Sequence, residues 1–224
     1  MSQATEIIAI DGPVGAGKSS VAKRVAQAMG FRFLDTGAMY RAATWRALHH
    51  LIPLDAGDAL AESTRAMDLD LKDTGSGFEV FVDGIDVTQA IRLPAVTRVI
   101  YKLDQNPRVR EHLVALQQRF GEEQPTVAEG RDIGTVVFPH AKCKIYLDAS
   151  PRCRAERRAR QLEQSGITVD LEQLCEAIRE RDEQAMKRAH SPLCRAEDAV
   201  LVDSTNLSFE EAVEAIVQLA REKL

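Results

Sequence analysis

The sequence of 224 residues contains no apolar run close to the roughly 18 residues that a membrane-spanning helix needs. Its first residues lack the basic and apolar regions of a secretory signal peptide. The four cysteines are widely spaced and form no Cys-x-x-Cys pair, which favours free thiols over a metal or disulfide site. From these absences we expect a cytoplasmic protein that does not bind membranes.

Neither sign of charge dominates, since 34 acidic and 29 basic residues give a net charge of −5. A weakly acidic chain lacks the electrostatic pattern of a general nucleic-acid binder. No repeat, no Ser/His/Asp arrangement and no Asn-Lys-x-Asp guanine-reading stretch is present. The length allows one α/β domain with an insertion, and because nothing indicates an obligate partner we expect a monomer.

A glycine-rich loop is the most informative feature that is present. It comprises Gly12, Pro13, Val14, Gly15, Ala16, Gly17, Lys18, Ser19 and Ser20. An apolar run at 6–11 precedes the loop and a helical pattern to Met29 follows it, which is the context of a phosphate-binding loop. The glycines let several backbone N–H groups point at one anion, and the helix N-terminus adds positive potential. Lys18 would reach the β- and γ-phosphates and Ser19 would bind Mg²⁺, whereas an ordinary glycine turn needs neither side chain.

The remaining pattern predicts an α/β fold, a five-stranded parallel sheet with helices on both faces. The strands are expected at 6–11, 31–34, 126–129, 142–148 and 199–203. Right-handed crossovers place the carboxyl ends of parallel strands along one edge, where ligands bind in open sheets. We therefore expect the glycine loop, Asp35, Gly130, Asp132 and Asp148 to gather at that edge, and Thr36 to cap the helix that follows Asp35.

Residues 56–106 interrupt this alternation. A helical pattern at 58–67 precedes two stretches of alternating apolar residues joined by a turn at 74–77, which predicts a β-hairpin. A small antiparallel sheet does not belong in a parallel core. We interpret 56–106 as an inserted subdomain of small sheet and helices, with 1–55 and 107–224 forming the core that contains the phosphate-binding loop.

Arginines from separate segments are candidates for binding phosphate. Arg41, Arg110 and Arg131 suit phosphate oxygens through their guanidinium forks, although a surface ion pair is the common use of a single arginine. Asp132 either pairs with Arg131 or accepts hydrogen bonds from a substrate. If the chain transfers a phosphoryl group from the bound triphosphate to an acceptor that is itself a phosphate, no general base is needed. Catalysis would then depend on positioning the two phosphates and on stabilising charge.

The helix expected at 151–164 is rich in arginine. Five of its residues are Arg152, Arg154, Arg157, Arg158 and Arg160. They form either a solvated helix face or a mobile lid, about 151–168, that closes over the triphosphate, with a hinge at Ser165 and Gly166. On the next helix, Arg181 and Arg188 are two turns apart on one face and reach the same phosphates or pair locally.

Three stretches together, 10–20, 35–41 and 129–139, resemble bacterial cytidylate kinase. The resemblance implies transfer of the ATP γ-phosphoryl group to CMP or dCMP, giving CDP or dCDP and ADP, with Mg²⁺. It also implies an enlarged insertion that binds the nucleotide monophosphate, at 56–106. A small-metabolite kinase of the shikimate type or a GTP-binding switch is the alternative.

The same resemblance assigns site residues. It implies that Lys18, Arg131 and Arg157 are catalytic, with Arg157 as a lid residue on ATP. The residues that it implies for the acceptor nucleotide are Thr36, Tyr40, Arg41, Arg110, Arg131, Asp132, Arg181 and Arg188. Tyr101 and Ala185 depart from the family pattern at positions associated with the pentose, which leaves the choice between ribose and deoxyribose open.

Overall fold

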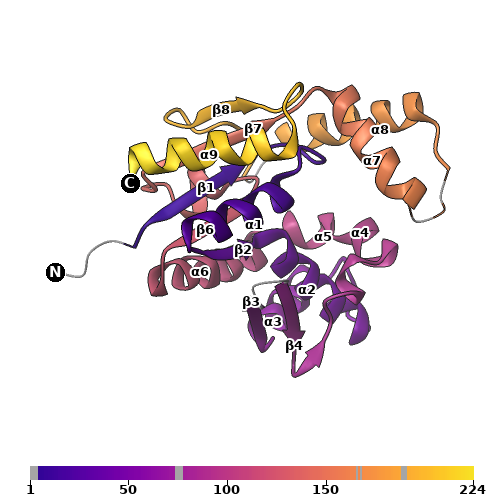
Figure 1. Ribbon diagram of the computed structural model, residues 1–224. Helices are drawn as coiled ribbons and strands as arrows, with labels where there is room; N and C mark the ends of the chain where they lie inside the picture. The colour runs from indigo at the N-terminus through magenta and orange to yellow at the C-terminus, as the bar shows by residue number, and fades with distance from the viewer. Residues whose placement is uncertain (1–4, 74–77, 165, 167, 188–190) are drawn as a thin grey trace.

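The computed structural model describes residues 5–73, 78–164, 166, 168–187 and 191–224 (Figure 1). Within these ranges, no helix combines the length and the apolar character needed to cross a membrane. Among the described residues, the four cysteines are unpaired, as the sequence predicts.

A five-stranded parallel sheet forms the centre of the molecule, in the order β2-β6-β1-β7-β8. The strands are β1 (Ile7–Asp11), β2 (Arg32–Asp35), β6 (Thr126–Gly130), β7 (Cys143–Asp148) and β8 (Val200–Asp203). All five residues of β1 are buried because this strand lies between β6 and β7, where both faces are covered. The predicted parallel sheet is confirmed, and its strands carry the site residues to one edge.

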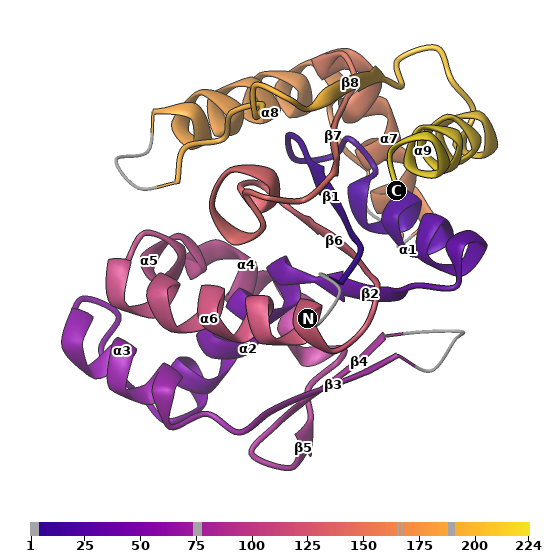
Figure 2. The ribbon, with the colours of Figure 1, turned by 90° about the vertical axis from the view of Figure 1, so that its left-hand side faces the viewer.

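Helices cover both faces of the sheet (Figure 2). The longer helices are α1 (Lys18–Met29), α2 (Thr36–His49), α6 (Pro107–Glu123), α7 (Pro151–Gln164), α8 (Leu171–Met186) and α9 (Phe209–Lys223), of which α7 and α8 pack chiefly against each other. The first and last of these pack together on one face, while α2 and α6 lie on the other. Ser208 and Glu211 form the predicted capping box of α9. The expectation that Thr36 caps α2 is wrong, because the Asp35 carboxylate accepts from the Ala38 N–H and so caps the helix itself.

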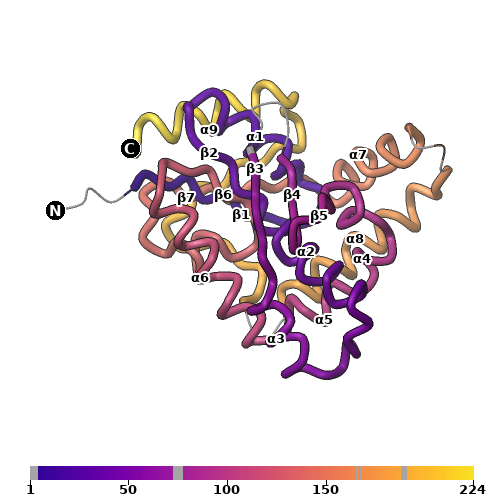
Figure 3. Tube along the Cα trace, turned by 90° about the horizontal axis from the view of Figure 1, so that it is seen from below, coloured from indigo at the N-terminus to yellow at the C-terminus, as the bar shows by residue number. Residues whose placement is uncertain are grey.

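The segment between α2 and α6 contains a small antiparallel sheet, β3-β4-β5, seen from below in Figure 3. Its elements are α3 (Gly57–Arg65), β3 (Leu69–Asp73), β4 (Phe78–Val82), β5 (Ile85–Asp86), η1 (Ala90–Arg92), α4 (Pro94–Val99) and α5 (Tyr101–Asp104). The predicted pairing of β3 with β4 is confirmed, and the turn expected at 74–77 lies outside the described residues. Phe78 meets Phe33 of β2 edge to face, with ring centroids 5.5 Å apart. This segment therefore shares one hydrophobic core with the large sheet.

Candidate active site

The glycine loop between β1 and α1 has the backbone that a phosphate cradle requires. Gly15 and Gly17 have φ angles of 83° and 90°, in the left-handed region that glycine adopts most readily. Gly12 lies so close to β7 that an added Cβ would be 2.0 Å from the carbonyl oxygen of Leu147. Only glycine fits at this position, and α1 begins directly afterwards at Lys18, so its N-terminus faces the loop.

Lys18 and Ser19 lie beside a buried carboxylate from β6. Lys18 Nζ donates to the Pro13 carbonyl oxygen at 2.9 Å, and Ser19 Oγ donates to Glu129 Oε1 at 2.6 Å. Burial lowers the pKa of Lys18, whereas the Glu129 carboxylate opposes that shift. Burial, with the neighbouring Asp35 carboxylate, raises the pKa of Glu129 to about 7. Hydroxyl and carboxylate oxygens are the ligands Mg²⁺ prefers, so this pair fits the ion that a triphosphate carries.

Asp11, the last residue of β1, binds backbone N–H groups of the segment that follows β6. Its two carboxylate oxygens accept from the N–H groups of Ile133 and Gly134, each at 2.7 Å. These residues begin η2 (Ile133–Val137), a single π turn that the sequence analysis did not predict. Burial raises the pKa of Asp11 to about 6 despite these bonds. Asp11 thus fixes the segment after β6 to the start of the glycine loop, which leaves Glu129 as the carboxylate nearest Ser19.

A buried ion pair joins α6 to the end of β6. Arg110 Nη2 contacts Asp132 Oδ2, and each side chain is about 10% exposed. Tyr40 of α2 places its ring 5.5 Å from the Arg110 guanidinium carbon. The interpretation that Asp132 pairs with its neighbour Arg131 is therefore wrong, because Arg110 takes that position.

Three further predicted residues belong to α2 or directly follow β6. Thr36 Oγ1 donates to the Glu129 carbonyl oxygen at 2.8 Å, and an added Cβ at Gly130 would lie 2.6 Å from that hydroxyl. Arg131 Nη1 lies 3.3 Å from Asp104 Oδ2, and the charge of Arg131 contributes to the lowered pKa of Lys18. Arg41 is half-buried on α2 and has no ion-pair partner among the residues that the structure describes. Thr36 and Arg131 therefore lie near Glu129 and Lys18, beside the glycine loop.

The arginines of α7 divide between two uses. Arg154 is buried, donating to the Val14 carbonyl oxygen at 3.1 Å and pairing with Asp182 of α8 at 2.6 Å. Arg157 donates to the Ala16 carbonyl oxygen at 3.3 Å and to the Ser204 carbonyl oxygen at 2.7 Å. The solvated-face interpretation is thus wrong for these two.

Arg152 and Arg158 are exposed and pair with Glu172 and Gln161, as a solvated helix face would. Arg158 makes this contact within α7 itself, to a residue one turn later. Arg181 lies on α8 with an exposed side chain, whereas Arg188 and the hinge residue Ser165 lie outside the described residues.

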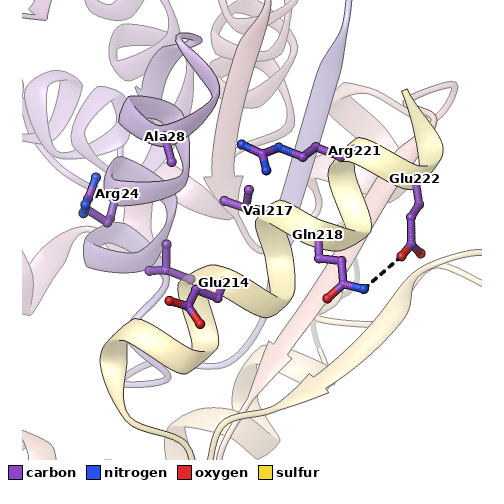
Figure 4. Close-up of a pocket in the computed structure, with 8 residues that line it drawn as sticks. Arg24, Ala28, Glu214, Val217, Gln218, Arg221 and Glu222 are labelled. Carbon is purple, nitrogen blue, oxygen red and sulfur yellow. Dashed lines mark hydrogen bonds between the residues drawn. The ribbon is translucent and has the colours of Figure 1, made fainter.

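Two hollows in the structure lie apart from this convergence. A hollow of about 510 Å³ between α1 and α9 is lined by Arg24, Val217 and Arg221, among others, and contains no residue of the glycine loop (Figure 4). Another of about 430 Å³ lies between the α7–α8 pair and the ends of β7 and β8, with Arg154 and Asp182 on its wall. The site is therefore defined by its side chains and not by either of these hollows.

Comparison with known proteins decides the family. The family model described as cytidylate kinase matches residues 8–222. The chain belongs to the cytidylate kinase family. Cytidylate kinases of Klebsiella pneumoniae and Salmonella paratyphi B are 44% and 43% identical to it, over 97% and 100% of this chain and 96% and 99% of their own lengths. The predicted resemblance to this family is confirmed.

Some relatives are longer. A bifunctional pantoate ligase/cytidylate kinase of Synechococcus elongatus is 49% identical over 97% of this chain, yet the chain spans only 42% of that protein's length. Among solved structures, a Thermus thermophilus protein gives a TM-score of 0.51 at 19% identity, covering 99% of both chains. An uncharacterised Eubacterium ventriosum protein gives 0.53 at 12%, covering 97% of this chain and 99% of its own. These two likenesses concern the fold alone.

Proposed function

We propose that this protein transfers the γ-phosphoryl group of ATP to CMP or dCMP, giving ADP and CDP or dCDP. The buried Arg110–Asp132 pair carries this proposal, because Asp132 would read the base while its neighbour Arg131 would bind the phosphate. The family's name and its relatives' names support the same reaction. No feature of the described site favours a small neutral acceptor or a guanine nucleotide.

The acceptor would lie between α2, α6 and the end of β6. The Asp132 carboxylate can accept a hydrogen bond from the exocyclic amine of cytosine, a donor that uracil lacks. Thr36, Tyr40 and Arg110 would enclose the base, while Arg41 and Arg131 would bind the monophosphate. A phosphate oxygen is already anionic near neutral pH, so no side chain has to remove a proton.

The donor would occupy the glycine loop, with its phosphates on the backbone N–H groups of residues 14–20. Lys18 would stabilise the charge that moves during transfer, and Arg157 would contribute a second cation from the lid. In the structure, the guanidinium of Arg157 is held by carbonyl oxygens of the glycine loop and of Ser204. It would exchange these for phosphate oxygens, which are stronger acceptors because they are charged.

Mg²⁺ would bind through the Ser19 hydroxyl, with Glu129 beside it. The ion would neutralise charge on the phosphates during transfer. Arg181 and Arg188 would complete the acceptor side, the latter from outside the described residues. We also propose 56–106 as the acceptor-binding insertion and 151–168 as the lid. Action in the cytoplasm as a monomer stays a prediction.

A panel of acceptors tests the proposal. CMP, dCMP, UMP and AMP would each be offered with saturating MgATP, and ADP release would be measured. We expect CMP or dCMP to be used with the highest kcat/KM, and the ratio between these two would settle the sugar preference. CMP used no better than AMP would overturn the assignment. In a separate nucleotide competition, selective binding of GTP would support the alternative of a GTP-binding switch.

A further inference from the structure

Asp104, the last residue of α5, touches two of the acceptor-side arginines. Its Oδ2 lies 3.3 Å from Arg131 Nη1, and its backbone carbonyl oxygen accepts from Arg110 Nη1 at 3.4 Å. The Asp104 side chain is only 8% exposed. A carboxylate is rarely buried to this extent unless it is paired, so its contact with Arg131 explains why it is tolerated there.

The contact completes a balanced group of charges. Arg110 and Arg131 contribute two cations, and Asp104 and Asp132 contribute two anions. Asp104 belongs to the segment between α2 and α6, whereas Arg131 follows a strand of the large sheet, so the bond crosses between them. The side chain of Arg131 is more exposed, at 28%, and a long arginine needs such a partner to keep one orientation.

Arg131 retains capacity for phosphate while Asp104 holds it. A guanidinium has five N–H donors in a fixed plane, and the contact with Asp104 engages one end of that plane. The charge of Arg131 also lowers the pKa of Lys18, so the guanidinium acts on the side of the site where the acceptor phosphate would meet Lys18. Asp104 itself has no donor for a phosphate and would repel it, so any contribution it makes to transfer runs through Arg131.

We propose that Asp104 is a positioning residue that fixes Arg131 in the orientation required for phosphoryl transfer, an inference that rests on the proposed function. This role affects kcat more than acceptor binding. Removing the Asp104 carboxylate frees Arg131 to leave the position it needs in the transition state, which lowers kcat. The same change removes a negative charge close to the bound acceptor phosphate, which favours acceptor binding. The KM for CMP should therefore not rise when kcat falls.

The test compares Asp104→Asn with wild type and with Asp58→Asn. Asp58 also makes an ion pair to α6, with Arg108 at 2.5 Å, but it is exposed and touches no acceptor-side arginine. With saturating MgATP, we expect kcat of Asp104→Asn to fall about 10- to 100-fold, the effect of losing one charge-assisted hydrogen bond. Its KM for CMP should stay unchanged or fall, and Asp58→Asn should behave as wild type.

Two further variants separate positioning from folding. Asp104→Glu keeps the charge and should recover much of the kcat that Asp104→Asn loses. In an Arg131→Ala background, Asp104→Asn should cause no further loss, because the group through which it acts is gone. An equal fold-loss in that background, a raised KM with a lowered Tm, or an unchanged kcat would each overturn the role of Asp104. A wild type inactive toward CMP would instead overturn the proposed function.

Discussion

Breaking the Arg110–Asp132 pair should reveal how much the stability of the folded protein depends on these two buried charges neutralising each other. Arg110→Met keeps the length of the side chain and removes its cation, leaving Asp132 about 10% exposed without its partner. Stranding a buried charge in this way costs about 3–5 kcal/mol. The contact with the Tyr40 ring adds about 0.5 kcal/mol or more. Each kcal/mol lowers Tm by about 2–4 °C in a chain of this size, so we expect a fall of about 10 °C.

A double-mutant cycle measures the compensation directly. Asp132→Leu alone should destabilise the protein by a similar amount, because it strands the arginine. The double variant Arg110→Met/Asp132→Leu should be destabilised by at least about 2 kcal/mol less than the sum, since neither charge remains buried. The assay is thermal and urea unfolding, with the exposed pair Arg108–Asp58 as a control whose loss should cost less than about 1 kcal/mol. Additive losses in the cycle would refute the reasoning.

The glycine loop gives three further predictions. Gly12→Ala should destabilise the protein by about 2 kcal/mol or more, seen by thermal unfolding, because its Cβ would lie 2.0 Å from the Leu147 carbonyl oxygen. A wild-type Tm would contradict this close approach. Lys18→Met should lower turnover about 100-fold or more without lowering Tm, since an interaction made with transferring charge is lost while a desolvated ammonium is removed. A large fall in Tm would make the lysine structural. Ser19→Ala should raise the Mg²⁺ concentration for half-maximal activity, with Glu129 left in place; an unchanged Mg²⁺ titration would show that the hydroxyl does not bind the ion.

Much of the sheet could be predicted because its signals are local. The apolar run of β1, the glycines after it and the helical pattern after Lys18 lie within a few tens of residues, and the structure reproduces them. Even here the sequence was ambiguous where two residues compete. Asp35 and Thr36 both suit a helix cap, and Asp35 takes that role while Thr36 bonds to a neighbouring strand.

The parts that were missed depend on partners distant in the chain. The π turn η2 is held by Asp11, more than a hundred residues earlier, so no local pattern marks it. The pairing of Arg131 with Asp104 joins elements whose proximity only the folded chain creates. Within α7, the sequence does not distinguish Arg154 from Arg158, yet the packing against the glycine loop buries only Arg154. What the sequence left undetermined are these contacts between distant residues, and the one short turn that such a contact holds in place.

The recognition of cytosine by Asp132 is the claim on which the assignment depends most. It is tested by the ratio of kcat/KM for CMP over UMP, measured for wild type and for Asp132→Asn. An asparagine amide can donate to the uracil carbonyl that repels a carboxylate, so we expect the ratio to be high in wild type and to collapse in the variant. A ratio that is the same in both proteins would contradict it.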